Sequence, residues 1–377
     1  MMKTNNLGLY IHIPFCIKKC KYCDFLSFSC SDEELLLAYV EALISEINRQ
    51  SPKYAYTVDS IFIGGGTPTL ISAEYIWSIL DEIYRSFKVD SDVEKTIESN
   101  PKTLTIDKLK AYNQMRINRL SIGVQSLDDD LLNLLGRAHT TEDFYSNFHD
   151  ARIVGFDNIN VDLIFSIPGQ TVPVWVKTLN KILELDPEHI SFYSLQLEKD
   201  TEFYKMYEEG KLDLIDEETD RLMYHKALTM MEQKGYIHYE ISNASKPGYE
   251  CRHNLKYWSM ENYLGLGLGA HSYIDGYRFA NVEDIKKYIE STDQVDWIHK
   301  NSENDDITEY IITGLRKIEG ISLKEFERIY RVNLYELYKE TIDKHVNNGL
   351  LEIDTKGRLK LTKLGVDLAN KVLVDFV

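Results

Sequence analysis

Residues 10–25 read YIHIPFCIKKCKYCDF and hold Cys16, Cys20 and Cys23 in a C-x3-C-x2-C arrangement. The apolar run at residues 9–14 has the length and composition of a buried strand, so the cysteines are expected on the loop that follows it. Three thiolates on one short loop can converge on one metal centre. In a cubane of four irons, three cysteine ligands leave the fourth iron open to a small molecule. The spacing therefore favours a [4Fe–4S] cluster with one open iron.

Two other kinds of cysteine site fit this stretch less well. A structural zinc ion usually takes four ligands, but the sequence offers only His12 as a nearby nitrogen and no second C-x2-C pair downstream. A thioredoxin-like dithiol would use Cys20 and Cys23 and leave Cys16 without a role. The remaining cysteines, Cys30 and Cys251, are expected to be plain thiols.

The composition is that of an acidic protein from a reducing compartment. Lys and Arg number 43 against 60 Asp and Glu, and the net charge of −17 argues against a broad nucleic-acid footprint. Five cysteines, three of them clustered, do not make a disulfide framework, and the N-terminal residues do not resemble a signal peptide. No apolar run approaches the roughly 18 residues that span a bilayer. We therefore expect a cytoplasmic protein whose contact with a membrane, at its inner face, would be peripheral.

Strand and helix patterns alternate along the first half of the chain. A helix is expected over residues 31–50, with Ser31 and Glu34 as its capping residues. Further helices are expected at residues 72–87, 106–115, 128–135, 141–154 and 174–185, and strands at residues 9–14, 58–63, 95–99, 119–124, 158–165 and 189–195. Parallel neighbouring strands require crossovers, so this α/β alternation predicts a parallel sheet. The periodicity fits an open sheet and a barrel equally well.

Beyond residue 200 the alternation ends, and three domains are predicted, at residues 1–200, 201–300 and 301–377. The middle one is expected to hold a helix at 217–234 and a strand at 236–242. Residues 301–306 are interpreted as a solvated linker. Helices, a hairpin and a last helix follow the linker, which makes the C-terminal part α+β and similar to winged-helix domains. This part has no basic stripe, so a role as a lid or in partner docking is favoured over nucleic-acid binding.

The cysteine stretch resembles the signature of the radical S-adenosylmethionine (SAM) superfamily, in which an aromatic residue, here Tyr22, precedes the third cysteine. The resemblance implies a partial (β/α)6 barrel over about residues 7–197 and a SAM molecule chelated to the open iron. It also implies that the glycine-rich turn GGGTP binds the amino group of SAM, through Gly65, Gly66 and Thr67.

Four further segments, TIESNP, SIGVQS, LGRAH and NVDLIF, are similar to the coproporphyrinogen III oxidase-like branch of that superfamily. The resemblance implies that their polar residues line the SAM site together with two tyrosines. These residues are Glu98, Gln125, Arg137, Asp162, Tyr10 and Tyr22. A carboxylate suits ribose hydroxyls or an ammonium group, and a guanidinium suits a carboxylate.

Within that branch the sequence is closer to the HemW family of haem chaperones than to the oxidases themselves. The oxidases carry another cysteine where this chain has Phe25, and a longer segment before the cluster. HemW proteins have an H-N-x-x-Y-W motif proposed to hold haem, and residues 253–258 read HNLKYW. The resemblance implies a haem site made by His253, Asn254, Tyr257 and Trp258.

The leading hypothesis is a haem chaperone with a [4Fe–4S] cluster and a SAM site. Its partners would be haem as cargo and haem-acceptor proteins, membrane-associated ones among them, and it would form a homodimer. The first alternative is an oxygen-independent coproporphyrinogen III oxidase that decarboxylates its porphyrinogen substrate through SAM radical chemistry. The second is a radical enzyme that modifies nucleic acid, and the charge balance argues against it.

Overall fold

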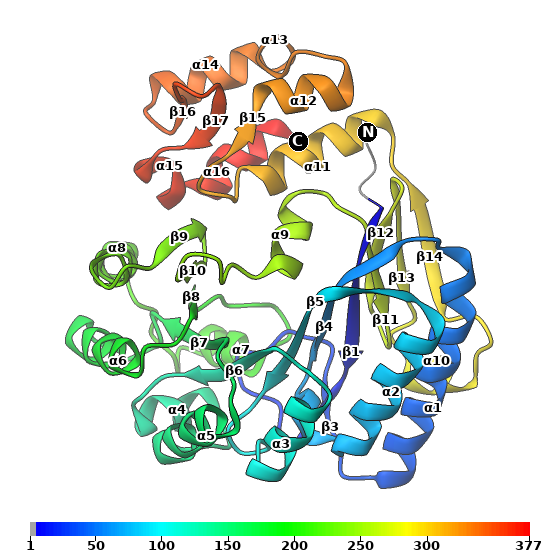
Figure 1. The fold of residues 1–377 in the computed structure, drawn as a ribbon. Coiled ribbons are helices and arrows are strands. Elements are labelled where there is room, and N and C mark those ends of the chain that lie inside the picture. Colours follow the sequence, from blue (N-terminus) through cyan, green and yellow to red (C-terminus); the bar gives the residue numbers. More distant parts are fainter. Residues whose placement is uncertain (1–4) are drawn as a thin grey trace.

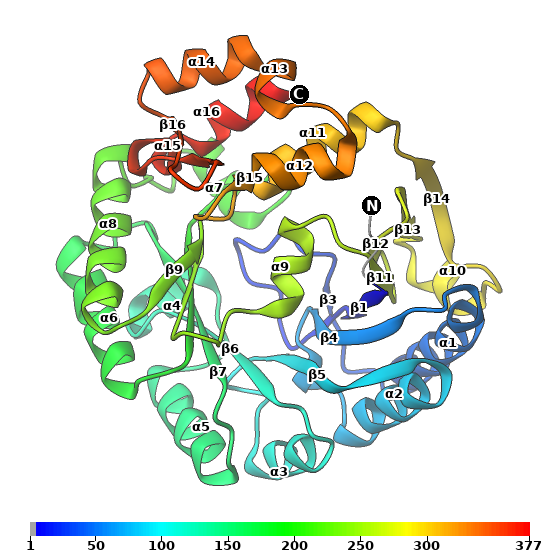
Figure 2. The same cartoon turned by 45° about the horizontal axis from the view of Figure 1, so that its top comes forward.

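The computed structural model describes residues 5–377, and its main feature is a strongly curved twelve-stranded sheet (Figures 1 and 2). Its strand order is β14-β13-β12-β11-β1-β4-β5-β6-β7-β8-β10-β9. The six central strands are parallel to one another, as predicted. They are β1 (Asn6–Ile13), β4 (Thr57–Gly65), β5 (Lys88–Ser99), β6 (Arg119–Gln125), β7 (Ile159–Phe165) and β8 (His189–Ser194).

Helices cover the outside of this sheet, and Figure 2 shows them around the ring of strands. The outward side chains of β1, such as Leu9 and Ile11, are fully buried under these helices, whereas the inner face of the strands carries polar groups. The covering helices are α1 (Glu33–Gln50), α2 (Ala73–Ser86), α3 (Ile106–Gln114), α4 (Asp129–Leu135), α5 (Thr141–Val154), α6 (Val172–Leu185) and α8 (Glu217–Gln233). The architecture is therefore the α/β partial barrel that the resemblance implied.

The start of α1 differs from the prediction. Its N-cap is Asp32, whose carboxylate accepts hydrogen bonds from the backbone N–H groups of Glu34 and Leu35. A carboxylate at this position satisfies two free N–H groups and suits the positive end of the helix dipole. Ser31 therefore does not cap the helix.

Both edges of the sheet hold strands that were not predicted as such from the sequence. β11 (Tyr263–Leu266) joins β1 in parallel and is followed by the antiparallel strands β12 (His271–Ile274), β13 (Tyr277–Asn281) and β14 (Val295–Lys300). At the other edge, the single strand expected at residues 236–242 is replaced by β9 (Ile237–Glu240) and β10 (Asn243–Ser245). β9 and β14 are the two ends of the strand order, so the barrel is open.

The HNLKYW motif forms the short helix α9 (Arg252–Trp258), which Figure 2 shows in the middle of the ring of strands. Its first N–H groups have no side-chain cap from the preceding residue, Cys251. The carboxylate of Glu94 on β5 replaces that cap and accepts hydrogen bonds from the backbone N–H groups of Arg252 at 3.1 Å and His253 at 3.0 Å. An acceptor from a remote strand thus fixes the helix at the start of the barrel strands.

The C-terminal part has its own core, which includes Ile311, Phe326, Ile342 and Leu359. A three-stranded sheet, in the order β15-β17-β16, packs with helices above the barrel in Figure 1. The elements of the C-terminal part are α11 (Glu303–Gly314), β15 (Ile321–Ser322), α12 (Leu323–Tyr330), α13 (Leu334–Leu337), α14 (Lys339–Asn347), β16 (Leu351–Ile353), β17 (Arg358–Leu361), α15 (Lys363–Asp367) and α16 (Ala369–Leu373).

Three short elements complete the barrel part: β2 (Phe15–Cys16), β3 (Phe28–Ser29) and α7 (Glu202–Glu208). The helix α10 (Ile285–Glu290) lies between β13 and β14 in the chain.

The interpretation of residues 301–306 as a solvated linker is wrong. The Asn301 side chain is buried, and its Nδ2 donates to Asp306 and to Glu309, both at 3.0 Å. Ser302 and Asp305 then form a capping box that starts α11 at Glu303. Ser302, Glu303 and Asn304 are exposed, but Asn301 and the capping box tie the segment to α11, so it is the start of a helix and not a linker.

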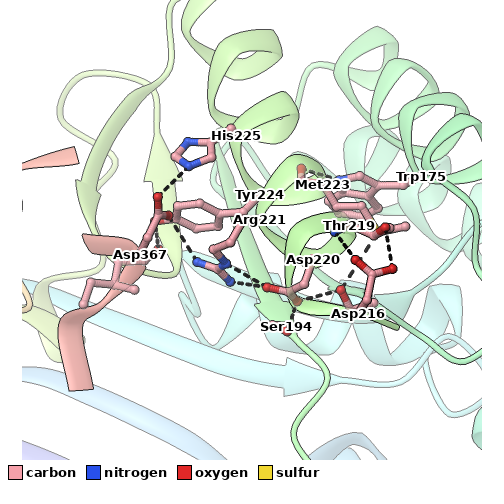
Figure 3. Close-up of polar contacts among 12 residues, drawn as sticks. Trp175, Ser194, Asp216, Thr219, Asp220, Arg221, Met223, Tyr224, His225 and Asp367 are labelled. Carbon is pink, nitrogen blue, oxygen red and sulfur yellow. Dashed lines mark hydrogen bonds and ion pairs between the residues drawn. The ribbon is translucent and has the colours of Figure 1, made fainter. Parts of the chain in front are cut away.

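A chain of polar contacts joins the C-terminal part to the barrel (Figure 3). On α15, Asp367 accepts hydrogen bonds from His225 Nε2 at 2.9 Å and from Arg221 Nη1 at 3.4 Å, both on α8. Arg221 Nε also donates to Asp220 at 2.8 Å, and Asp220 in turn accepts a hydrogen bond from the hydroxyl of Ser194 at the end of β8. The network therefore runs from a barrel strand to the last helices of the chain.

Candidate functional site

The three cysteines of the C-x3-C-x2-C stretch line one cavity of about 380 Å³. The loop is held at its two ends by the pairing of β2 with β3. A hydrogen bond from Cys30 N to the Cys16 carbonyl oxygen, at 3.2 Å, adds to this pairing. A second backbone bond, from Cys23 N to the Cys20 carbonyl at 3.2 Å, tightens it. The sulfurs of all five cysteines are free thiols. Within residues 5–377 no group of three His, Cys, Asp or Glu side chains is arranged to hold a single metal ion.

The predicted SAM residues other than Tyr10 come together around the same cavity. They lie near the carboxyl ends of four strands, β4 to β7, where barrels concentrate their chemistry. The residues on this lining are Tyr22, Gly65, Gly66, Thr67, Glu98, Gln125, Arg137 and Asp162. Tyr10 does not line it; this tyrosine lines two neighbouring cavities, and its hydroxyl lies 2.9 Å from His12 Nδ1.

The glycine turn provides space directly beside the cysteines. A Cβ atom on Gly66 would lie 3.0 Å from Cys16 Sγ and 2.8 Å from the Phe15 carbonyl oxygen, so no larger residue fits without a shift. Gly65 has a φ of 114°, which favours glycine, and its N–H donates to Glu98 Oε2 at 3.1 Å. The Thr67 hydroxyl lies 3.6 Å from Cys16 Sγ. The turn therefore brings backbone and hydroxyl groups against the first cysteine.

Arg137 is a partly buried cation on the lining of this cavity. Its Nη1 lies 3.6 Å from Cys20 Sγ and its Nη2 donates to the Gly123 carbonyl oxygen, but its Nε is buried without a partner in residues 5–377. A buried unsatisfied N–H costs stability until an acceptor binds it. Three convergent thiols and a guanidinium with a free N–H fit a [4Fe–4S] cluster and a ligand that carries a carboxylate.

Two of the carboxyl groups on the cavity lining, Glu98 and Asp162, differ in their surroundings. Burial, and then the nearby charge of Asp162, raises the pKa of Glu98 to about 8. Asp162 is supplied with hydrogen bonds from Ser121 Oγ at 3.0 Å and Asn160 Nδ2 at 2.8 Å. Burial also raises the pKa of the Cys16 thiol, so this sulfur carries a proton that a metal would have to displace.

Sequence analysis missed several residues of this region. A smaller cavity of about 190 Å³ lies inside the barrel and shares Glu98 and Asp162 with the larger one. Its other polar lining residues include Arg119, Ser121, Asn160 and Ser191. The signal that could have found three of them is the alternation of polar and apolar residues in the strands, with Arg119 and Ser121 on one strand and Asn160 and Asp162 on the next.

His253 of the HNLKYW motif is a buried, hydrogen-bonded ring. Its side chain is 1% exposed, its Nδ1 lies 2.9 Å from Ser60 Oγ, and its Nε2 lies 2.8 Å from the Tyr257 hydroxyl. Burial, together with the positive charges of Lys256 and Arg119, lowers the pKa of His253 to about 3. The ring is therefore neutral near pH 7, and both of its nitrogens are engaged.

The four motif residues do not share one cavity. His253 and Asn254 line the small cavity inside the barrel, whereas Trp258 lines a larger one of about 730 Å³ on the β11 side. Tyr257 lines both. The Trp258 ring is covered by the guanidinium of Arg316, whose carbon lies 4.6 Å from the ring centroid, and its Nε1 is buried without a partner in the described chain.

The large cavity also reaches the cluster loop and the C-terminal part. Its lining includes Lys19, Asp24 and Phe25 of the cysteine loop and Thr313 of α11. Phe25 is 63% exposed and lines the cysteine cavity as well. The two cavities are therefore neighbours, and Phe25 is the aromatic residue that lines both.

No helix in residues 5–377 combines the length and the apolar character that crossing a membrane demands.

Comparison with known proteins places this arrangement in a family. The family model of the Radical SAM superfamily matches residues 10–182, and that of the HemN C-terminal domain matches residues 301–368. Among solved structures, coproporphyrinogen III oxidase (HemN) from Escherichia coli, described as a radical SAM enzyme, superimposes with a TM-score of 0.85 at 23% identity. This match covers 98% of this chain and 90% of the oxidase, and it shows that the fold is shared.

Curated relatives are more similar in sequence. Heme chaperone HemW of Bacillus subtilis (strain 168) is 40% identical over 374 residues, which cover 98% of both chains. Heme chaperone HemW of Lactococcus lactis subsp. lactis (strain IL1403) is 35% identical over 370 residues, which cover 98% of this chain and 96% of the relative. With such identity along nearly the whole length, the chain belongs to the HemW family of radical SAM proteins.

Proposed function

We propose that this protein binds haem and transfers it to acceptor proteins. The observation that carries the proposal is the cavity of about 730 Å³ lined by Tyr257 and Trp258 beside the cysteine loop. Ligand pockets usually measure roughly 300–1,000 Å³ and combine aromatic walls with a few polar groups. Aromatic faces and the apolar Phe25 and Met260 suit the flat surface of a porphyrin.

Each motif residue has a part in this proposal. Tyr257 and Trp258 provide contact surface for the porphyrin, and His253 holds the Tyr257 hydroxyl from behind. Asn254 lines the small inner cavity and not the large one. Its link to the cargo site is that it lies on α9 together with Tyr257 and Trp258. The relatives from Bacillus subtilis and Lactococcus lactis carry the name heme chaperone, which supports haem as the cargo here.

The cluster and SAM would be held by the cysteine cavity. Cys16, Cys20 and Cys23 would ligate a [4Fe–4S] cluster, and Arg137 and the glycine turn would bind the carboxylate and amino groups of SAM. When bound, the cluster supplies an open iron at which SAM can be chelated. The residues of this chain orient that ligand: the Gly65 turn allows its close approach, and Glu98 presents an oxygen to it.

The acceptor proteins are part of the same proposal, and membrane-associated ones would be met by peripheral contact at the inner face of the membrane. A homodimer is proposed as the working form. We assign domain limits at residues 1–200, 201–300 and 301–377, with the last part serving as a lid or docking domain. Contact of Arg316 with Trp258 supports a link between that domain and the cargo site.

A haem titration followed by optical spectroscopy tests the function. Tyr257→Leu and Trp258→Leu remove a flat face but keep an apolar side chain, so each should weaken haem binding roughly tenfold, about 1.4 kcal/mol. Trp77→Leu is the control, because Trp77 is 55% exposed on α2. Absence of any saturable Soret band in the unaltered protein, with and without its cluster, would refute the proposal.

A second candidate function is coproporphyrinogen III oxidation, and the complete SAM constellation around the cysteine cavity favours it. Phe25 argues against it, since the resemblance places a further cysteine of the oxidases at that position. Anaerobic incubation of cluster-loaded protein with coproporphyrinogen III, SAM and a reductant separates the two. Formation of protoporphyrinogen would establish the oxidase activity.

A further inference from the structure

The iron of a bound haem needs a ligand atom, and the histidine of the HNLKYW motif is poorly placed to provide it. Both ring nitrogens of His253 already have hydroxyl partners, and the ring is almost fully buried. A second histidine, His12, lines the large cavity but is engaged in the same way. Its Nδ1 lies 2.9 Å from the Tyr10 hydroxyl, its Nε2 lies 2.9 Å from the Leu26 carbonyl oxygen, and it is 7% exposed.

One other histidine lines this cavity, and its ring is free to bind. His271 is the first residue of β12 and is exposed. Its imidazole makes no hydrogen bond to any group in residues 5–377, and its neighbour is the ring of Trp297, with centroids 5.8 Å apart. Neutral imidazole is a common iron ligand of haem proteins.

We propose that His271 is an axial ligand of the haem iron, with the porphyrin lying in the cavity that His271 shares with Tyr257 and Trp258. This inference rests on the proposed function, because it takes haem as the ligand of that cavity. It assigns the histidine of the motif a positioning role and moves the iron-binding atom to the first residue of β12.

The loop that presents His271 is held firmly from behind. The carboxylate of Glu46 on α1 accepts hydrogen bonds from the Gly267 N–H at 2.9 Å and from Asn281 Nδ2 at 2.7 Å. The Tyr39 hydroxyl accepts from the Leu268 N–H at 3.0 Å and donates to the His12 carbonyl oxygen at 2.7 Å. A ligand on such a braced loop loses little freedom when it binds, which favours affinity.

Glycines bring this loop close to β1 and to the start of β12. Gly267 and Gly269 have φ angles of 106° and 62°. A Cβ atom on Gly265 would lie 2.2 Å from the His271 carbonyl oxygen, so only glycine allows the turn that places His271 on the cavity. The repeat of glycines in residues 265–269 thus has a structural purpose that leads to this histidine.

Three other soft or anionic donors in this region are less available than His271. Met260 is 6% exposed, and its sulfur lies 3.7 Å from Arg278 Nη2. Cys251 is fully buried and does not line the cavity. The Tyr257 hydroxyl is engaged by His253. Lys19 lies on the lining as well, so a cation is present for a propionate of the porphyrin.

The test is a titration of the full-length protein with ferric haem, followed by optical and electron paramagnetic resonance spectra. His271→Ala should abolish the signature of imidazole ligation and raise the Kd roughly tenfold or more. Added free imidazole should restore the signature in this variant, which a merely structural role of His271 would not explain. His149→Ala is the control, because His149 is exposed on the outer helix α5.

His253→Ala separates the two histidines. We expect this variant to keep the imidazole signature, even where its haem affinity falls. The proposal is overturned if His271→Ala binds haem with an unchanged spectrum and Kd, or if His253→Ala is the variant that loses the signature and regains it with imidazole. Failure of the unaltered protein to bind haem would instead overturn the proposed function.

Discussion

The Tyr257 hydroxyl lies 2.8 Å from Nε2 of His253, so the two residues of the HNLKYW motif that look most reactive are bound to each other. They are one turn apart on α9, and helical residues at this spacing face the same side. Ser60 of β4 closes the other side of the imidazole at 2.9 Å. The motif is thus a structural unit that fixes the orientation of Tyr257, and the spacing of the motif follows from this contact.

The buried imidazole makes stability depend on pH. The pKa of His253 is about 3 in the folded protein and near 6.5 when unfolded. Between these two pH values the unfolded chain binds more protons than the folded protein, so the free energy of unfolding rises with pH. The stability that the neutral ring contributes is therefore lost as the pH falls from about 6.5 toward 3. His253→Gln removes the titrating ring and should therefore flatten this slope. It should also lower the free energy of unfolding at pH 7 by about 1–3 kcal/mol, because the hydroxyl groups of Ser60 and Tyr257 lose a well-placed hydrogen-bond partner.

Urea unfolding at several pH values measures that slope for the unaltered and the variant protein. His299→Gln is a matched control, because His299 is exposed on β14. Equal slopes in the unaltered protein and in His253→Gln would contradict the assignment of a neutral, buried ring.

The cysteine cavity predicts a specific loss of iron. Cys20→Ala removes one of three thiols that share the cavity, and an incomplete ligand set holds a cluster poorly. The brown absorbance of anaerobically reconstituted protein should disappear, and iron and sulfide content should fall with it. Cys30→Ala tests the specificity, because Cys30 lies outside the cavity lining and should leave the cluster intact. Undiminished iron in Cys20→Ala would refute its role as a ligand.

SAM affinity should depend on the protonation of Glu98. Its pKa of about 8 means that the carboxyl group is largely neutral at lower pH, whereas an ammonium group binds the charged form better. SAM affinity should therefore rise between about pH 7 and 9 and then level off. Glu98→Gln should remove this rise and weaken binding at pH 8.

Equilibrium dialysis of SAM with cluster-loaded protein under anaerobic conditions provides the measurement. Glu198→Gln is the control, since Glu198 is an exposed carboxylate on the lining of the same cavity. A flat affinity profile in the unaltered protein would mean that Glu98 is not the group that responds to pH.

The sequence predicted those parts of the fold that local signals determine. The helix at residues 141–154 was placed without error, because Thr140 and Asp143 form a capping box and Gly155 ends the helix with a φ of 103°. The strands β12 to β14 were not predicted, because β11 pairs with β1, which is remote in sequence, and the pairing rather than local propensity extends the sheet.

For the candidate sites, too, features that depend on local signals were predicted and those that depend on contacts remote in sequence were not. Residues at the ends of strands, such as Glu98 and Gln125, were assigned to one place because the carboxyl ends of parallel strands meet. The partner of His253 could not be predicted, since Ser60 is 193 residues away and an ordinary serine in sequence. The same limit applies to Asn301, whose polar character suggested solvent although its partners are Asp306 and Glu309.

The network in Figure 3 predicts how the C-terminal part is held. Asp367 is the acceptor that joins α15 to Arg221 and His225 of α8. Asp367→Asn keeps the shape of the side chain but removes its charge, which weakens both contacts and should cost about 1–2 kcal/mol because the carboxylate is only 16% exposed. Hydrogen exchange of α15 and α16 should become faster, while exchange in β6 and β7 stays unchanged.

Glu336→Gln is the matched control for this change, because Glu336 is exposed in the same C-terminal part on α13. The side chain of Asp220 links Arg221 to Ser194, which lines the cysteine cavity, so loosening of α15 should leave that wall in place. SAM binding is therefore expected to survive Asp367→Asn. If the variant lost SAM binding while α15 kept its slow exchange, Asp367 would support the cavity wall rather than hold the C-terminal helices.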